Sequence, residues 1–100
     1  MSYSEVVTAD IRLRLLQLLV AAAEYTQPEA ALGAALGEQY GHRLSADRLT
    51  EELFWLDSRG MVSRLPVGRT SIVALSARGM DVAAGRTQVP GVARPVPGEL

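Results

Sequence analysis

The N-terminal part of the chain carries apolar residues three or four positions apart, the spacing of one helix face. This pattern predicts a first helix with Thr8 as its N-cap and Asp10 in its first turn. Leu13, Leu16 and Val20 fall outside the apolar stripe. We therefore expect this helix to be covered on more than one side, either as the central helix of the domain or against a second subunit. The stripe itself consists of Ile11, Leu15, Leu18, Leu19 and Ala22.

Two further helices follow, each bounded by residues typical of helix ends. A second helix over 28–40 is predicted to have Pro28 at its first position and to end at Gly41. Ser45 is the predicted N-cap of a third helix over 46–59. The residues expected to face inward are Ala31, Leu32, Ala35 and Leu36 on the second helix and Leu49, Leu53 and Leu56 on the third.

The apolar period then changes from 3.6 to 2, which is typical of β-strands. Residues 61–65 and 70–75 are predicted to form a two-stranded hairpin, joined by a tight turn over 66–69. Ser76 is the predicted N-cap of a last short helix that ends near Ala84. Because an isolated hairpin is only marginally stable, we expect it to pack on the helices.

The remaining C-terminal residues hold proline and glycine at short intervals and form no core of their own. Residues 1–86 are therefore predicted to form the folded domain and residues 87–100 an extended tail. This tail is expected to dock in part through Val89, Val92 and Val96. A length of 100 residues agrees with a single small domain.

The order of predicted elements resembles a winged helix-turn-helix domain over roughly residues 8–86. The class is mainly α with a β-hairpin (α+β), in the order α-α-α-β-β-α. Residues 53–62, LFWLDSRGMV, resemble the L-x-x-L-x-x-x-G-h-V passage from recognition helix to wing, and residues 75–79, LSARG, resemble the L-[ST]-x-x-G that opens the last helix. The resemblance implies that the third helix is a recognition helix and that the hairpin is the wing.

A closer resemblance is to small winged-helix proteins of Mu-like phages and prophages, which are described as arsenic-repressor-like. It is carried by residues 10–13 (DIRL), 40–45 (YGHRLS) and 78–86 (RGMDVAAGR), the last continuing into residues 89–92 (VPGV). This resemblance implies a phage origin and the same fold. It assigns no role to any residue.

The distribution of charge decides where such a protein can meet DNA. The net charge is −1, which argues against a protein that coats DNA without specificity. Residues 1–58 hold four arginines and nine acids, a balance of −5, whereas residues 59–100 hold six arginines and two acids, a balance of +4. The third helix, counted over 45–59, has a balance of −2. A negative helix is penalised beside two rows of phosphates, so the expected contact moves towards the wing.

Two functions are consistent with this distribution. The first is DNA binding, by a transcription regulator or a DNA-associated packaging accessory, with contacts from Arg48, Arg64, Arg69, Arg78, His42 and Arg43. The alternative is a winged-helix protein-interaction module that binds a phage or host protein through Glu51, Phe54, Trp55 and Ser58. The wing arginines could equally be solvated surface residues or form salt bridges between subunits. We expect the protein to be a homodimer. Phe54 and Trp55 are adjacent, so either one packs under the wing or one is exposed as an anchor.

Other functional classes find little support in the sequence. Cysteine is absent and His42 is the single histidine, so no cofactor or metal site is expected. No catalytic constellation is recognisable, so the protein is expected not to be an enzyme. No apolar run reaches the ~18 residues of a membrane span, and no secretory signal is evident. We therefore expect a cytoplasmic protein of a bacterial host.

Overall fold

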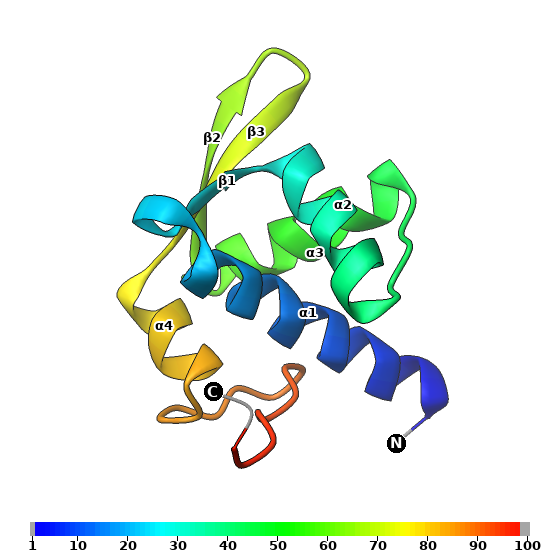
Figure 1. Ribbon diagram of the computed structural model, residues 1–100, viewed down its shortest axis with the longest axis vertical. Helices are drawn as coiled ribbons and strands as arrows, with labels where there is room; N and C mark the ends of the chain where they lie inside the picture. Colours follow the sequence, from blue (N-terminus) through cyan, green and yellow to red (C-terminus); the bar gives the residue numbers. More distant parts are fainter. Residues whose placement is uncertain (1, 99–100) are drawn as a thin grey trace.

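The computed structural model describes residues 2–98, which fold into four α-helices and a three-stranded antiparallel sheet (Figure 1). The confirmed α+β class shows the predicted order α-α-α-β-β-α of a winged helix-turn-helix domain, with one short strand and one 3-10 turn added between the first two helices. The elements are α1 (Tyr3–Ala21), η1 (Ala23–Tyr25), β1 (Thr26–Pro28), α2 (Glu29–Tyr40), α3 (Ala46–Ser58), β2 (Val62–Val67), β3 (Thr70–Leu75) and α4 (Ala77–Ala83).

Helix α1 is the central helix of the domain. Leu13 and Leu16 are as fully buried as Leu15 of the predicted stripe, because α1 packs against α2, α4 and β3. The second side of this helix is thus covered within the chain itself. The predicted start at Thr8 is wrong: the N-cap is Ser2, whose hydroxyl oxygen accepts a hydrogen bond of 3.2 Å from the backbone N–H of Glu5. An earlier N-cap was missed because the first turn of α1 has no buried face.

The start of α2 also differs from the prediction. Pro28 is the last residue of β1 and the N-cap of α2, and not its first helical position. Its extended backbone, with φ −61° and ψ 145°, lets one residue end a strand and precede a helix. Leu32 and Leu36 are buried as predicted, whereas Ala31 is exposed. Gly41 ends α2 in the left-handed conformation, as predicted.

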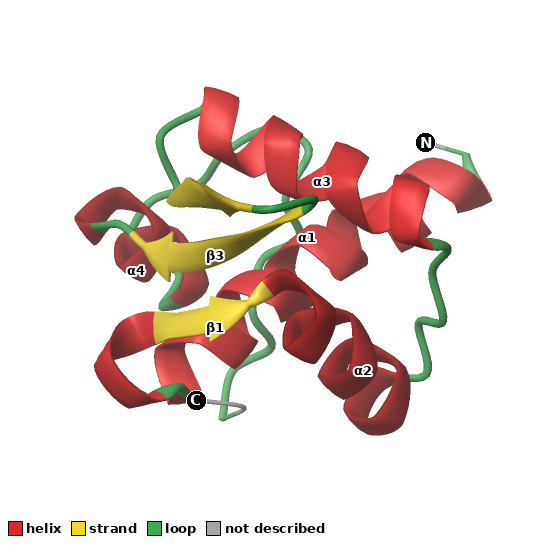
Figure 2. Cartoon of the chain, turned by 90° about the horizontal axis from the view of Figure 1, so that it is seen from above, coloured by secondary structure: helices red, strands yellow, loops and turns green. Residues whose placement is uncertain are grey.

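The sheet has the strand order β1-β3-β2, with β3 in the centre. Viewed from above, α3 lies beside β2 and α2 lies beside β1 (Figure 2), and the two helices also contact each other. In the hairpin Val67 pairs with Thr70, so Gly68 and Arg69 alone form the turn. The predicted turn over 66–69 is therefore too long, because Pro66 lies within β2, where an edge strand tolerates its missing N–H. Strand β1 was not predicted, since three residues are too few to show a period.

The described part of the C-terminal segment, residues 87–98, lies along α1 (Figure 1). Val89 and Val92 are buried in the core, and the Ala93 N–H donates to the Ala9 carbonyl at 3.1 Å. Val96, which was expected to dock with the other two valines, is exposed. Residues 99–100 of the predicted tail lie outside the described residues. Within residues 2–98 no helix is long and apolar enough to cross a membrane.

Candidate nucleic-acid interface

The outer face of α3, the predicted recognition helix, is acidic. Asp47, Glu51, Phe54 and Ser58 are exposed along it, and 62% of Phe54 is accessible. Leu49, Leu53 and Leu56 face the core, as predicted. Two carboxylates and one aromatic ring therefore dominate the surface that a groove-reading helix would present.

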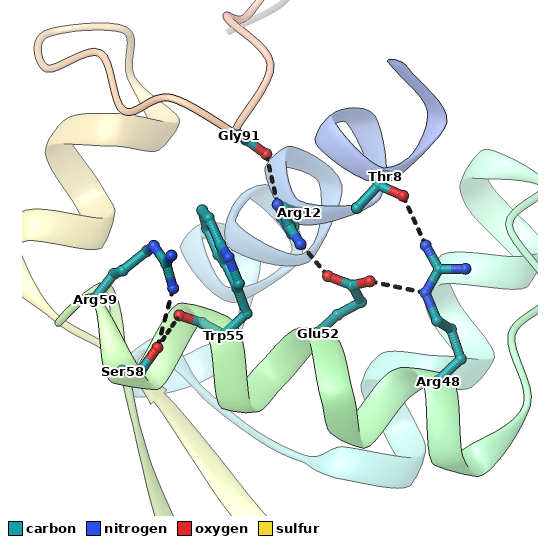
Figure 3. Close-up of polar contacts among 8 residues, drawn as sticks. All are labelled: Thr8, Arg12, Arg48, Glu52, Trp55, Ser58, Arg59 and Gly91. Carbon is teal, nitrogen blue, oxygen red and sulfur yellow. Dashed lines mark hydrogen bonds and ion pairs between the residues drawn. The ribbon is translucent and has the colours of Figure 1, made fainter. Parts of the chain in front are cut away.

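Glu52 is a buried charge at the inner side of α3 (Figure 3). Its Oε1 lies 2.7 Å from Nε of Arg12, and its Oε2 lies 2.7 Å from Nε of Arg48. Charges in such a position are tolerated when they are paired and hydrogen-bonded. This cluster was missed in the sequence, where Glu52 counted only as a neighbour of Glu51. Its spacing from Leu49 and Leu56 was the available signal, because it places Glu52 on the buried stripe.

Arg48 was predicted to be the contact of α3 with DNA, and its guanidinium is turned towards the protein. Besides Glu52, it contacts Thr8 of α1, donating from Nη2 to Oγ1 at 2.8 Å (Figure 3). The arrangement follows from the burial of Glu52, since each of its two carboxylate oxygens needs a hydrogen-bond donor once it is removed from water. The side chain of Arg48 is still 38% exposed, and it shares the single negative charge of Glu52 with Arg12.

Trp55 lies between two arginines and does not pack under the wing. The guanidinium of Arg12 lies 3.7 Å and that of Arg59 3.9 Å from its ring centroid, both suitable for cation–π contact. The indole also borders Gly91, where an added Cβ would lie only 2.9 Å from Trp55 Cζ2. Of the two adjacent aromatic residues, Phe54 is thus the exposed one, and Trp55 fastens α3 to α1 and the C-terminal segment.

The turn between α2 and α3 holds two of the predicted DNA contacts, His42 and Arg43, and only His42 is paired with a carboxylate of the described residues. His42 is held by α1, with its Nε2 2.7 Å from Oδ2 of Asp10. Asp10 also pairs with Arg14, whose Nε lies 3.3 Å from Oδ1. Arg43 is exposed and pairs with no carboxylate of the described residues. Only the second of these two predicted DNA contacts is therefore open to an outside anion.

The wing carries the other predicted contacts. Arg64 pairs with Asp57 of α3 at 3.2 Å and lies 5.6 Å from the ring of Phe54, so it joins the wing to the acidic face. Arg69, in the turn, is exposed and has no carboxylate partner in residues 2–98. Arg78 of α4 is exposed and donates from Nε to the carbonyl of Arg59 at 3.1 Å. The predicted DNA contacts therefore do not form one patch. Arg48 faces inward, whereas Arg69 lies in the hairpin turn, the end of the hairpin that projects away from the helices (Figure 1).

Within the described residues, no group of three or more histidine, aspartate and glutamate side chains is placed to hold a metal ion. Many of the charged side chains of the described residues form ion pairs or cation–π contacts with one another or with aromatic rings. The surface features that stand out are thus the acidic face of α3 and the free-standing wing.

A known relative covers almost the whole chain. The sequence is 34% identical over 94 residues to uncharacterized protein gp26 of Escherichia phage Mu, covering 94% of this chain and 96% of the phage protein. The chain belongs to the family of this Mu protein. No protein-family model matches it.

Solved structures with a similar fold come from RosR of H. salinarum. One RosR structure superimposes with a TM-score of 0.65 at 26% identity and covers 73% of this chain and 64% of the RosR chain. The complex structure of hsRosR-S1 gives a TM-score of 0.67 at 23% identity, with 80% and 70% covered. The chain thus spans slightly less than two thirds of the first of these RosR chains.

Proposed function

We propose that this chain is a DNA-binding winged-helix protein of a Mu-like phage or prophage, acting as a transcription regulator or a DNA-associated packaging accessory. The observation that carries the proposal is the wing, which projects from the helices and presents Arg69 without an ion-pair partner in residues 2–98. Similarity to the RosR structures supports a DNA-binding regulator at the coarse level, and the Mu relative supports the phage setting.

The proposed contact is made to the DNA backbone more than to base edges. Arg43, Arg69 and Arg78 are the exposed cations of the predicted set, whereas Arg48 and Arg64 are held by carboxylates. Phosphate contacts position a protein on DNA, while sequence is read by side chains in a groove. The logarithm of the binding constant is expected to fall with the logarithm of salt concentration, with a slope of about −1 for each of these arginines that contacts a phosphate.

The test is fluorescence anisotropy of labelled random and phage duplexes at about 50 mM and about 200 mM salt. Arg69→Ala is expected to reduce the salt slope by about one, because one phosphate contact is lost. Arg86→Ala is the matched control, since Arg86 is exposed but paired with Asp81 at 2.9 Å on α4. Absence of salt-dependent binding at micromolar protein would overturn the proposal.

We also propose a homodimer, because paired half-sites on DNA match a two-fold protein. Tyr3 and Val6 are exposed on the first turns of α1, and an apolar pair there suits contact with a second copy. Light scattering at tens of micromolar should then give about twice 10.7 kDa. A mass of one chain, for wild type and for Tyr3→Ser/Val6→Ser alike, would reject the dimer.

A second candidate function is the docking of a basic protein segment on α3. It is favoured by the exposure of Phe54 amid Asp47 and Glu51. A labelled lysine-rich peptide with a central leucine serves as the probe. Under this candidate, Phe54→Ser and Glu51→Gln weaken peptide binding, and wild type binds the peptide in preference to DNA. Under the first proposal the same variants leave DNA binding unchanged or slightly stronger, because a repulsive carboxylate is removed.

A further inference from the structure

The outward face of the hairpin is uncharged and exposes apolar side chains. Side chains on a strand alternate between its two faces, so Leu65 and Val67 share one side of β2. Their cross-strand partners on β3 are Ile72 and Thr70. Leu65 is 65% exposed and Val67 49% exposed. The six outward positions of the hairpin contain no charge: they are Ser63, Leu65, Val67, Thr70, Ile72 and Ala74.

No described segment packs over the outer end of this face. The C-terminal segment, which lies along α1, is at the opposite end of the molecule from the hairpin turn (Figure 1). Nor is β2 suited to pair with a strand from another protein, because Pro66 in its middle lacks the N–H that such pairing requires. An occupant of this region must therefore contact the side chains of the wing and not extend its ladder of hydrogen bonds.

A free cation adjoins the apolar pair. Arg69 follows Val67 by two positions, in the turn, and no carboxylate of residues 2–98 pairs with it. A narrow arm that joins apolar side chains to an arginine matches proteins that enter the DNA minor groove, which insert Leu, Ile, Met, Phe or Pro between base steps and use arginine to read the groove. A protein that makes only a small number of phosphate contacts gains little affinity from them, and an apolar contact of this kind would add to it.

We propose that Leu65 and Val67 are the apolar wedge with which the wing opens the DNA minor groove at a deformable base step, while Arg69 contacts the groove or an adjacent phosphate. This inference rests on the DNA binding proposed above and names how that binding selects its site. Pyrimidine–purine steps unstack and kink most easily, so they are the expected targets. The protein is then expected to bend its DNA.

The test uses full-length protein and a duplex of about 30 base pairs with donor and acceptor dyes at its ends. One duplex carries central TA and CA steps, and a second carries a stiff A-tract at the same place. Wild type is expected to raise energy transfer on the first duplex and to bind it more tightly than the second. Leu65→Thr/Val67→Thr should bind the flexible duplex about tenfold more weakly and lose the bend at saturation, with its salt slope unchanged. Threonine keeps the strand preference of these positions, and thermal melting confirms folding.

Two control variants separate the apolar contact from the charge. Arg69→Ala is expected to weaken binding and lower the salt slope by about one, yet to retain the bend at saturation. Leu65→Ile/Val67→Ile is expected to retain both affinity and bend, since both side chains stay apolar and their total volume grows by only one methylene group.

The outcomes distinguish this inference from the function on which it rests. Salt-dependent binding by wild type without any bend overturns the wedge and leaves DNA binding intact. If the double threonine variant bends DNA as much as wild type does, the wedge is likewise overturned and DNA binding is left intact. A fall in mass of that variant from dimer to single chain identifies the face as an interface between copies, which also rejects the wedge. If wild type binds no duplex at either salt concentration, the proposed function fails and the wedge fails with it.

Discussion

Helix α3 and the wing place charge and apolar surface in opposite ways. On its inner side α3 carries Glu52, only 5% exposed, between two arginines, and it meets solvent with carboxylates and the ring of Phe54. The wing has Arg69 at its tip and leaves Leu65 and Val67 in solvent. In the first region an arginine serves the fold, and in the second it is free for an external anion. Exposure and pairing, more than residue type, thus separate a structural arginine from a contact residue.

The buried cluster also explains why α3 is a weak candidate for reading the major groove. Its N-terminal arginine is tied to α1 through Thr8 and to its own helix through Glu52. If Arg48 moved away to reach a base, Oε2 of the buried Glu52 carboxylate would lose its partner, and this loss would raise the free energy of the folded state. The free energy of a DNA contact must therefore come from residues that the fold does not already use.

The largest expected effect comes from breaking the buried cluster. Glu52→Gln keeps the shape of the side chain but leaves the largely buried side chain of Arg12 without a counter-charge. We expect the free energy of unfolding to fall by about 2–3 kcal/mol, below the full value for a buried pair because Arg48 is partly solvated. Urea denaturation measures it. Glu51→Gln is the matched control on the exposed face and is expected to change stability by less than about 0.5 kcal/mol.

The contact between the cluster and the C-terminal segment gives the next effect. Gly91 has φ +95°, and its added Cβ would lie 3.0 Å from Nη1 of Arg12 as well as against Trp55. Gly91→Ala is therefore expected to lower stability by about 2 kcal/mol and to shift the emission of Trp55, the chain's single tryptophan, as the indole gains water. Gly98→Ala has a similar φ of +85° and open space around it, so it controls for backbone strain alone. Equal losses in the two variants would show that the contact with Trp55 contributes nothing.

A smaller effect is expected at the start of α3. The hydroxyl oxygen of Ser45 accepts a hydrogen bond of 3.1 Å from the backbone N–H of Arg48. Ser45→Ala should cost about 1 kcal/mol, since one N–H of the first turn loses its acceptor. Ser63→Ala, on the exposed side of β2, makes the same chemical change where no cap exists. If thermal melting shows the two variants to be equally stable, the cap does not hold α3 in place.

The elements that sequence reasoning placed well are those with strong local signals. Ser45, Gly41 and the leucines of α3 define their helix ends and faces by short-range rules that the structure obeys. Strand β1 was not predicted, because it is defined by its pairing with β3, which lies more than forty positions away in the sequence. The first residues of α1 were not predicted to be helical, because an exposed helical turn shows no apolar pattern.

The candidate site was harder to predict than the fold. The position of Arg48 near the start of α3 suggests a DNA contact, and nothing local reveals that Glu52 and Thr8 hold its side chain. Partners such as Thr8 come from a different element, so only the folded arrangement shows which cations are already paired. The exposure of Arg69 could be predicted from the sequence alone, since a residue in the turn between two paired strands lies at the surface.

The smallest expected effect tests the wing side of the comparison. Leu65→Thr/Val67→Thr is expected to change the free energy of unfolding by less than about 0.5 kcal/mol, because Leu65 is 65% and Val67 49% exposed and neither belongs to the buried core cluster. Val73→Thr, on the opposite face of the neighbouring strand and fully buried, is the contrasting control and should cost more than about 1 kcal/mol, roughly the penalty of burying an unpaired hydroxyl. Urea denaturation of the three proteins decides between two origins for the exposed pair. A loss for the double variant as large as that for Val73→Thr would mean that Leu65 and Val67 belong to the core and are not a surface kept apolar for a ligand. A negligible loss, joined to the loss of DNA bending, would assign their apolar character to binding alone.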